Sequence, residues 1–239
     1  MRTLGIIGGV SWHSTLQYYK LLNQSVARNV GKNHSARIIL NSIDFADLLT
    51  WQRDKSNKLL IDAFVAEGRK LHAAGCEAFI IASHTLGWLG EIIELETGIK
   101  HISIYDALFR KLNSLNATRV GLTGTRYTMQ DSLYRERYQK AGFEVVAPDQ
   151  PHLTSTAAIV YTELVHGIFL PESKKVFGEC FQNLIARNAD AIVLGCTEIG
   201  LLISEREWPV ISSYEKKSVP VIDLIEAHVP ECLSWMLST

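Results

Sequence analysis

The 239-residue sequence contains no cysteine pair in a C-x-x-C pattern. Its four cysteines, Cys76, Cys180, Cys196 and Cys232, lie far apart, which argues against a zinc ribbon and a redox dithiol motif. Free cysteines are typical of a reducing compartment. The N-terminus runs directly into a strand-like segment, residues 3–7, and resembles no signal peptide. Together these features predict a cytoplasmic protein.

The sequence also lacks a long apolar run and an excess of charge. No stretch approaches the roughly 18 apolar residues of a membrane-spanning helix, so no membrane partner is expected. The formal net charge is −1 and the lysines and arginines form no stripe, so nucleic acid is not an expected partner. Neither a G-x-G-x-x-G nor a Walker A motif is present, which disfavours a nucleotide ligand.

Short apolar runs followed by longer amphipathic segments are the main pattern that the chain does contain. The runs that predict strands are residues 4–7, 36–40, 78–82, 120–122, 144–146, 191–194 and 219–222. The segments that predict helices are residues 14–27, 58–74, 129–141 and 172–187. Alternation of helices with continuously apolar strands predicts an α/β fold whose parallel sheet is covered on both faces.

An internal repeat divides the pattern in two. Residues 4–9 resemble residues 120–125 at an offset of 116, and residues 77–85 match residues 190–198 at an offset of 113. Two matches at nearly one offset predict two similar α/β halves related by pseudo-twofold symmetry. We expect the active site in the cleft between the halves, because open α/β sheets bind ligands at the carboxyl ends of their strands.

The expected first half comprises residues 1–103 together with 217–239, and the second half comprises residues 104–216. This division assumes that the last strand and the terminal helix return to the first half. Gly75 and Gly142 each stand between a helical pattern and a strand, where a left-handed residue is expected to end the helix.

Two loops after predicted strands combine glycine with hydroxyl side chains. Residues 8–15 place Ser11 and Ser14 at a helix start, where they either bind an anion together with backbone N–H groups or only cap the helix. In the equivalent loop of the second half, Thr125 and Thr128 allow the same two interpretations. Two anion-binding loops would suit a dicarboxylate or the carboxylate of an amino acid.

Cys196 follows the apolar run of residues 191–194 and aligns with Ser83 in the repeat. A thiol near a helix N-terminus and polar donors is expected to have a depressed pKa. The resulting thiolate can act as a nucleophile or as a general base. The other three cysteines are expected to be small buried hydrophobic residues.

Four more side chains allow two interpretations each. His84 and His228 either titrate in the cleft or are hydrogen-bonded structural residues. Glu198 either orients a thiol or a substrate amine, or places a favourable charge in the first turn of a helix. Arg53 either offers a cation to a distal carboxylate or lies at a solvent-facing helix start.

These residues resemble the aspartate/glutamate racemase family, which acts on amino acids without a cofactor. The resemblance runs nearly end to end, and residues 194–198, Leu-Gly-Cys-Thr-Glu, are its most diagnostic segment. The other matching segments are residues 5–12, 14–15, 18–19, 23, 34–36, 42–45, 124–129 and 220–223, with His228 after them. The resemblance implies no cofactor and no metal, a small amino acid or dicarboxylate as the substrate, and a homodimer.

The resemblance also implies a mechanism in which one cysteine in each half exchanges a proton with the α-carbon. Carried over by position, Cys196 is the acid/base of the second half. The positions expected to contact the substrate are Ser11, His84, Thr85, Thr125 and Thr197.

The first half departs from the family pattern. The family reads C-N-T-x-H where this chain reads Ser83-His84-Thr85-Leu86-Gly87. A serine hydroxyl is far less acidic than a thiol, so Ser83 is a poor general base, although it can donate a proton to a carbanion or pass one from His84 or water. We therefore expect proton abstraction by Cys196 and not by Ser83.

Three functions fit the sequence. The leading hypothesis is a cofactor-independent amino-acid racemase with Cys196 and Ser83 as its catalytic residues. The second is a lyase or decarboxylase that uses Cys196 alone, resembling arylmalonate decarboxylase, whose reaction needs protonation on one face only. The third is an amino-acid-binding protein that has lost turnover.

Overall fold

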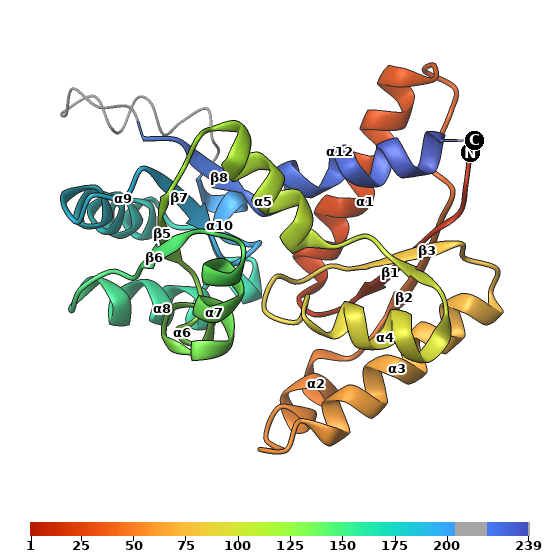
Figure 1. The fold of residues 1–239 in the computed structure, drawn as a ribbon, viewed down its shortest axis with the longest axis horizontal. Coiled ribbons are helices and arrows are strands. Elements are labelled where there is room, and N and C mark those ends of the chain that lie inside the picture. The colour runs from red at the N-terminus through yellow and green to blue at the C-terminus, as the bar shows by residue number, and fades with distance from the viewer. Residues whose placement is uncertain (204–218, 239) are drawn as a thin grey trace. The chain divides into compact units, whose positions relative to one another are not determined.

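The computed structural model describes residues 1–203 and 219–238 (Figure 1). It divides into two compact units, the first formed by Met1–Ala107 with Ile225–Thr239 and the second by Leu108–Leu224. Each unit contains one four-stranded parallel sheet with helices around it, which confirms the predicted α/β fold with two similar halves.

The first unit is built on a sheet of strand order β2-β1-β3-β4. Its strands are β1 (Leu4–Gly8), β2 (Ile38–Ser42), β3 (Ala78–Ile81) and β4 (Lys100–His101). Its helices are α1 (Trp12–Asn29), α2 (Phe45–Trp51), α3 (Lys58–Ala73), α4 (Leu89–Thr97) and most of α12 (Leu224–Leu237). Successive residues of β3 enter different apolar clusters, Phe79 with α3 and α4 and Ile80 with α1 and α12. Both faces of the sheet are therefore covered, as its continuous apolar strands require.

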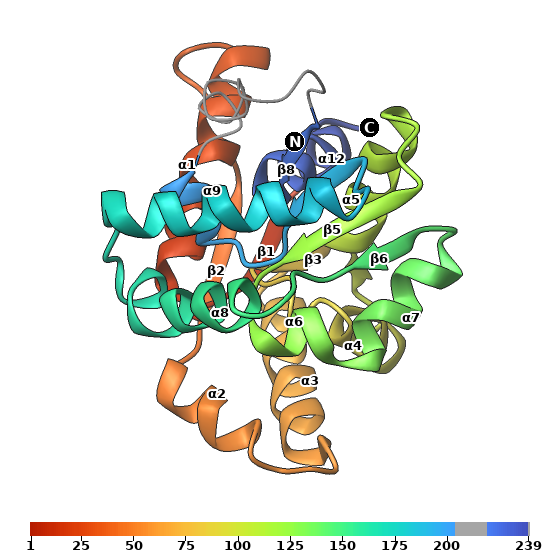
Figure 2. The ribbon, with the colours of Figure 1, turned by 90° about the vertical axis from the view of Figure 1, so that its left-hand side faces the viewer.

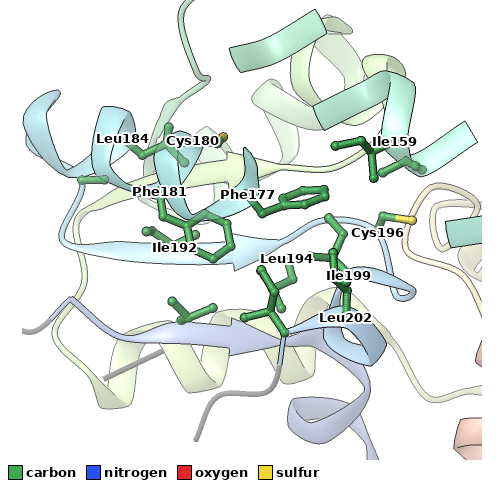
Figure 3. Packing of buried hydrophobic residues seen from close by; sticks show 14 of the residues in the cluster. Ile159, Phe177, Cys180, Phe181, Leu184, Ile192, Leu194, Cys196, Ile199 and Leu202 are labelled. Carbon is green, nitrogen blue, oxygen red and sulfur yellow. The ribbon is translucent and has the colours of Figure 1, made fainter. Parts of the chain in front are cut away.

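The second unit repeats this order as β6-β5-β7-β8. Its strands are β5 (Arg119–Thr123), β6 (Glu144–Val146), β7 (Ala191–Leu194) and β8 (Val221–Asp223). Its helices are α6 (Arg126–Gln130), α7 (Ser132–Lys140), α8 (His152–Thr162), the short η1 (Leu164–His166), α9 (Pro171–Ala186) and α10 (Ile199–Leu202), and α5 (Ile104–Ser114) runs from the first unit into the second. Helices α8 and α9 lie side by side (Figure 2). Phe177 and Phe181 of α9 pack with Ile192 of β7 in the core of this unit (Figure 3).

The strand register confirms the internal repeat residue by residue. Gly5 of β1 pairs with Phe79 of β3, and Gly121 of β5 pairs with Ile192 of β7. These pairs are related by the same offsets, 116 and 113, that the sequence alignment gives. The two sheets therefore share their register as well as their strand order.

Glycine in the first strand of each half has a packing role. A Cβ atom added to Gly5 would lie 2.9 Å from Leu71, and one added to Gly121 would lie 3.1 Å from Leu184. Leu71 and Leu184 come from the helix that precedes the central strand β3 or β7. A larger residue at either glycine would push this helix off the sheet.

Glycine also ends helices where the sequence predicts it. Gly75 and Gly142 have φ values of +85° and +92°, in the left-handed region that favours glycine. In the second half Asn188, with φ 65°, takes the place that Gly75 has in the first. Asparagine is among the few other residues that enter this region readily.

The last strand differs from the expectation. Leu194 of β7 pairs with Asp223 of β8, so β8 belongs to the second sheet, and the expected return of this strand to the first half is wrong. The reason is the repeat itself: β8 is the counterpart of β4, which pairs with β3. Only the terminal helix joins the first unit. The first expected boundary, 103/104, lies four residues before the observed one, and the second, 216/217, lies outside the described residues.

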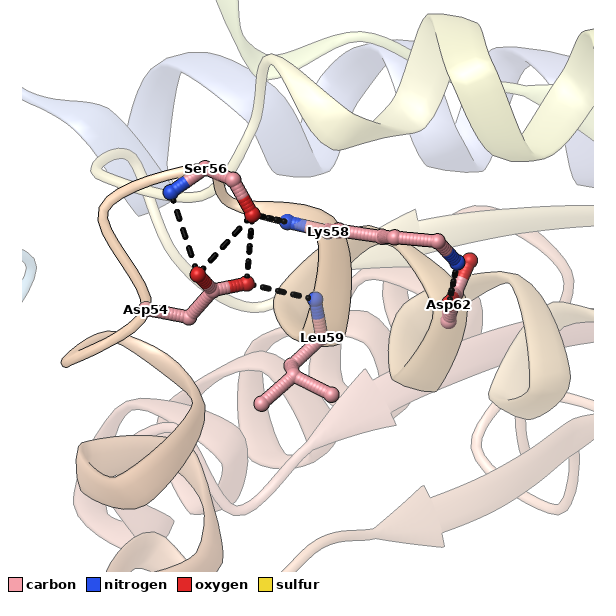
Figure 4. A network of polar contacts seen from close by, with 5 residues as sticks. All are labelled: Asp54, Ser56, Lys58, Leu59 and Asp62. Carbon is pink, nitrogen blue, oxygen red and sulfur yellow. Dashed lines mark hydrogen bonds and ion pairs between the residues drawn. The ribbon is translucent and has the colours of Figure 1, made fainter.

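A capping network forms the start of α3 (Figure 4). Asn57, which precedes the helix, makes no side-chain capping bond. Asp54 replaces it, because its carboxylate accepts hydrogen bonds from the backbone N–H groups of Leu59 at 3.0 Å and of Ser56 at 3.1 Å. These hydrogen bonds hold the pKa of Asp54 below its usual value. Arg53 is exposed in this turn.

Within residues 1–203 and 219–238, the helices include none long and apolar enough to cross a membrane. The same part of the chain brings together no group of three or more histidine, cysteine, aspartate or glutamate side chains suited to holding a metal ion.

Two buried thiols make the stability of the fold decrease as the pH rises above about 9. Burial raises the pKa of Cys76 from 9.0 to about 11 and that of Cys180 to about 12. The folded protein keeps these protons at pH values at which the unfolded chain releases them. The stabilisation is therefore complete below pH 9 and is lost as the pH rises through the folded-state pKa values.

We expect the melting temperature, followed by circular dichroism, to fall as the pH is raised from 9 to 11, the interval of the Cys76 shift. The Cys76→Ala variant is the control: its melting temperature is lower throughout, and its decline over this interval is shallower. A wild-type melting temperature that stays constant or rises across the interval contradicts the prediction.

Candidate active site

Cys196 lies two residues after the end of β7, on a turn that glycine makes possible. The N–H of Gly195 donates a hydrogen bond to the carbonyl of Thr123 at 2.7 Å, and a Cβ at Gly195 would lie 2.3 Å from that oxygen. A Cβ at Gly124 would lie 2.9 Å from the Gly195 carbonyl carbon. The loops that follow β5 and β7 therefore touch, and the backbone nitrogen of Cys196 would lie 3.2 Å from the same Cβ position.

The Cys196 thiol donates a hydrogen bond to a carboxylate. Its Sγ lies 2.9 Å from Oε2 of Glu198, and the Thr197 hydroxyl donates to the same oxygen at 3.1 Å. Cys196 is 7% exposed and Glu198 3%. In Figure 3 Cys196 is at the edge of the apolar cluster, and its sulfur points away from the labelled side chains. The turn thus presents a thiol and a carboxylate as one hydrogen-bonded pair.

The depressed thiol pKa expected from the sequence is wrong. Burial, followed by repulsion from the Glu198 carboxylate and the hydrogen bond to it, holds the pKa of Cys196 well above its ordinary value. The helix after Cys196 is α10, which has only four residues, so it offers little of the dipole that the expectation assumed. In the free protein at neutral pH, Cys196 is a thiol.

Thr125 caps α6, which is one of the two roles, helix capping and anion binding, that the sequence allows for it. Its Oγ1 accepts a hydrogen bond from the N–H of Thr128 at 3.1 Å and lies 2.8 Å from the Thr128 hydroxyl. The same hydroxyl interacts with Tyr161 of α8, a residue that the sequence analysis missed. Burial, with smaller contributions from Tyr127 and Cys196, raises the pKa of Tyr161. No sequence signal separates this tyrosine from the other residues of its helix.

Ser11 does not cap α1, in contrast to Thr125. Its side chain makes no capping hydrogen bond, and among the residues that the structure describes none is a hydrogen-bond partner for its Oγ. Ser11 is 5% exposed and has φ 74°, an uncommon value for serine. A buried hydroxyl without a partner costs about 1–3 kcal/mol. Such a hydroxyl at the start of an 18-residue helix is suited to an anionic ligand.

Thr15 closes the Ser11 loop. Its Oγ1 accepts a hydrogen bond from the N–H of Gly9 at 3.0 Å and donates one to the Ser11 carbonyl at 3.2 Å. His13 is a second residue that the sequence analysis missed: its ring packs on Trp12, with ring centroids 3.7 Å apart, and its Nδ1 is buried with no partner among the described residues.

Ser83 has the same position in the first unit as Cys196 in the second, two residues after the end of its strand. It is 6% exposed, and its Oγ accepts a hydrogen bond from the N–H of Leu86 at 3.4 Å. Because β1 and β3 are neighbouring parallel strands, Ser11 and Ser83 follow strands that end at the same edge of the sheet. The cleft expected between the two halves stays a prediction.

His84 and Thr85 follow Ser83. His84 is 2% exposed, its ring centroid lies 4.8 Å from that of Tyr105, and its carbonyl accepts a hydrogen bond from the Tyr105 hydroxyl at 3.0 Å. Thr85 is partly buried. The contribution of either side chain to substrate binding stays a prediction.

His228 is a hydrogen-bonded structural residue, which is one of the two roles that the sequence allows for it. It is fully buried in the first unit, with Nε2 3.0 Å from the carbonyl of Ile102 and Nδ1 2.8 Å from the hydroxyl of Tyr18. The carbonyl can only accept, so Nε2 carries the proton and Nδ1 accepts one from Tyr18. These bonds hold α12 against α1.

Comparison with known proteins finds racemases that are similar in sequence and in structure. A family model described as Asp/Glu/Hydantoin racemase matches residues 7–232. A candidate Asp/Glu racemase from Yersinia pestis is 33% identical in sequence, with a TM-score of 0.87 over all of both chains. An aspartate racemase homologue from Pyrococcus horikoshii is 24% identical, with a TM-score of 0.81 over all of both chains. Arylmalonate decarboxylase shares the fold at 14% identity, with a TM-score of 0.55 over 99% of this chain and 93% of the other.

Proposed function

The chain belongs to the Asp/Glu/Hydantoin racemase family, and we propose that it is a cofactor-independent amino-acid racemase in which Cys196 exchanges a proton with the α-carbon of the substrate. The observation that carries the proposal is the buried Cys196 thiol, hydrogen-bonded to Glu198 at the carboxyl end of β7. This edge of a parallel sheet is where such folds bind their ligands.

The protonated state of Cys196 determines its first role. A thiol can donate a proton to a carbanion directly, whereas it must lose its own proton before it can remove one from carbon. An amino-acid substrate brings a positively charged α-ammonium group, and a cation beside the thiol favours the thiolate. We therefore propose that the base form of Cys196 arises with the substrate bound and not in the free protein.

The Ser11 loop is proposed to bind the substrate carboxylate. The buried Ser11 hydroxyl can donate to a carboxylate oxygen, and the N-terminus of α1 favours a negative charge. In the second unit, Thr125 and Thr197 are proposed to contact the substrate as well. The substrate class is accordingly an amino acid, with or without a second carboxylate.

Replacing Ser11 by alanine provides a test of this role. Because its Oγ has no hydrogen-bond partner within the described chain, Ser11→Ala removes no internal hydrogen bond, and we expect an unchanged or slightly higher melting temperature. The Michaelis constant for the substrate is expected to rise about tenfold or more, the effect of losing a hydrogen bond to a charged group.

Thr15→Val is the matched control, because it removes the two hydrogen bonds that close the loop while keeping the shape of the side chain. It is expected to lower the melting temperature. If Ser11→Ala lowers stability and leaves the Michaelis constant unchanged, Ser11 is a structural residue and the assignment is wrong.

Ser83 is proposed to make the reaction asymmetric. A neutral hydroxyl can donate a proton but is a poor base, so α-proton exchange is expected to be fast on the Cys196 face, while inversion, which in one direction requires abstraction on the Ser83 face, is expected to be slow in both directions. The change from the family motif includes its surroundings: a Cβ at Gly87, where the family has histidine, would lie 2.9 Å from Ile104 and 3.0 Å from Tyr105. A side chain at position 87 would collide with α5. The glycine of the altered motif therefore fits the way in which α5 packs against this turn.

The racemase proposal is tested by incubating each enantiomer of the amino acids with the enzyme and separating the products by chiral chromatography. Slow formation of the opposite enantiomer from at least one carboxylated amino acid is the expected result. The proposal is wrong if every amino acid binds without any change at its α-carbon, which is the outcome for a binding protein that has lost turnover.

The protonated Cys196 thiol favours a second candidate, a decarboxylase of malonate-type acids. Loss of carbon dioxide leaves a carbanion that needs one proton from one face, and Cys196 in its resting state can supply it. Release of carbon dioxide from malonate-type acids, abolished by Cys196→Ala, would favour this function. Unchanged release in that variant would exclude Cys196 as the proton donor.

We also propose a homodimer, on the basis of the family resemblance, and a cytoplasmic location. The cysteines support the location, because all four are free and buried. Sedimentation equilibrium tests the assembly, for which a mass of twice the chain's 26.7 kDa is expected.

A further inference from the structure

We infer that His13 is the second residue of a carboxylate site at the start of α1: its Nδ1 donates a hydrogen bond to the same carboxylate that the Ser11 hydroxyl binds. The inference rests on the proposed role of the Ser11 loop and deepens it. It assigns a ligand contact to a histidine that the proposed reaction does not otherwise use.

Unpartnered polar atoms on one turn are the first observation. Among residues 1–203 and 219–238, three buried side-chain atoms have no hydrogen-bond partner: Oγ of Ser11, Nδ1 of His13 and Nε of Arg187. The guanidinium of Arg187 is ion-paired with Asp149 through another of its nitrogens. Ser11 and His13 are two positions apart, and buried polar atoms nearly always have a partner. Two such atoms on one turn point to a ligand that binds there.

The charge of this helix end is the second observation. The N-terminus of a helix carries a partial positive charge, which a capping side chain or an acidic residue in the first turn usually compensates. In α1 the residue before the helix, Ser11, makes no capping hydrogen bond, and the first turn contains no acidic residue. With 18 residues, α1 is long enough to develop this charge. An anion is therefore the ligand that the turn favours.

The His13 ring is held by stacking. Its centroid lies 3.7 Å from that of the Trp12 ring, with 30° between the two planes. Of its two ring nitrogens, only Nδ1 is buried without a partner. A neutral imidazole can carry its proton on Nδ1, and an imidazolium carries protons on both nitrogens, so Nδ1 can donate to an anion in either state.

The backbone around the two atoms is firmly packed. Thr15 bonds to the N–H of Gly9 and to the carbonyl of Ser11. Gly9 has φ 81°, and a Cβ added to it would lie 2.0 Å from the carbonyl oxygen of Ile43. The missing partners of Ser11 and His13 therefore belong to a well-fixed turn and do not result from a loose one.

A carboxylate suits two donors of this kind. Both of its oxygens accept hydrogen bonds, so the Ser11 hydroxyl and Nδ1 of His13 can each bind one of them. The N-terminus of α1 adds an electrostatic attraction for the same negative charge. His13 is accordingly a binding residue, and it is not expected to exchange a proton with the α-carbon.

The experiment places the hydrogen-bond donor at one ring position or the other. The amide N–H of asparagine replaces the Nδ1 donor, and that of glutamine replaces the Nε2 donor. The probe is succinate, a dicarboxylate without an amino group, and isothermal titration calorimetry measures its binding to the full chain. His13→Asn is expected to keep the dissociation constant within about threefold of wild type, whereas His13→Gln raises it about tenfold, the effect of losing a hydrogen bond to a charged group.

His13→Phe separates binding from packing, because it keeps a ring that can stack on Trp12 but has no donor. Its melting temperature is expected to stay near that of wild type, while its dissociation constant for succinate rises as in His13→Gln. His152→Gln is the matched control: His152 is also partly buried and begins a helix, α8 of the second unit. This control is expected to bind succinate as wild type does.

Three results overturn the inference. If His13→Phe binds succinate as tightly as wild type, His13 only packs on Trp12. If His13→Asn and His13→Gln weaken binding equally, the position of the donor is irrelevant and Nδ1 is not the contact. If the wild-type protein binds no succinate, the start of α1 is not a carboxylate site.

The two proposals fail in different ways, because binding of succinate needs no turnover. If succinate binds with the expected order of variants but no amino acid exchanges its α-proton, the racemase function fails and the carboxylate site stands. If exchange occurs and the three His13 variants bind succinate as wild type does, the proposed function stands and His13 is not part of its site. Undiminished succinate binding by Ser11→Ala rejects the role of the Ser11 loop and the inference about His13 with it.

Discussion

Replacement of Cys196 by serine is expected to slow α-proton exchange by about 10²–10⁴-fold, the contribution typical of a general acid or base. The hydroxyl can keep the hydrogen bond to Glu198, so the turn should remain in place, but it neither ionises nor transfers its proton as readily as a thiol. Loss of the α-hydrogen signal in deuterated water, followed by proton NMR, measures the rate.

Cys180 provides the comparison for this substitution. It is fully buried in the same apolar cluster as Cys196, so Cys180→Ala tests whether any perturbation of this core reduces the rate. We expect Cys180→Ala to lower the melting temperature through the cavity that it leaves, while exchange stays within a few-fold of wild type. A Cys196→Ser enzyme within tenfold of wild type would show that the thiol does not carry the chemistry.

Replacement of Ser83 by cysteine is expected to accelerate inversion by about tenfold to a hundredfold, the lower part of the range for an added acid or base. A thiol two residues after β3 would supply the group that the family has at this position. Because the two enantiomers are equally stable in solution, kcat/KM must rise by the same factor in both directions. Chiral chromatography of reactions started from each enantiomer measures the gain and checks this equality.

Ser83→Ala separates the two possible roles of the hydroxyl. If Ser83 delivers a proton, the alanine variant inverts its substrate more slowly than wild type but continues to exchange the α-proton on the Cys196 face. If wild type, Ser83→Ala and Ser83→Cys invert at the same rate, position 83 does not contact the reaction, and the proposed asymmetry has another origin.

The repeat is the part of the fold that the sequence predicted best. Gly5 and Gly121 are recognisable because each packs under a helix and tolerates no side chain, so the same constraint preserved both. The strand pairs Gly5–Phe79 and Gly121–Ile192 follow directly from it. Apolar runs at two separate offsets were therefore sufficient to predict the halves and their central strands.

The edges of the sheets were predicted less well. The two-residue β4 has too few residues to show a period, so its pairing with β3 was not anticipated. Without β4 as a template, β8 was assigned to the wrong half. The repeat identified the central strands because their glycines and apolar residues are buried on both faces, a constraint that β2, β4 and β6 share only in part.

The chemistry of the candidate site could be predicted only in part, because it depends on side-chain contacts that the spacing of residues along the sequence does not reveal. Position alone identified Cys196, but the sign of its pKa shift depends on burial and on the direction of the Glu198 side chain. Tyr161 lies 35 positions before Cys196 and reaches its surroundings only through the packing of α8. In the same way, only the structure shows that the Ser11 hydroxyl makes no capping bond and has no hydrogen-bond partner among residues 1–203 and 219–238.

The central claim is that Cys196 exchanges a proton with the α-carbon of an amino acid, and solvent deuterium incorporation by the wild-type enzyme tests it most directly. Each of the common amino acids, in both enantiomers, is incubated in deuterated water and its α-position is followed by proton NMR. We predict exchange with at least one carboxylated amino acid, faster than inversion and fastest for the enantiomer whose α-hydrogen faces Cys196. Retention of the α-hydrogen in every amino acid and both enantiomers would contradict the claim.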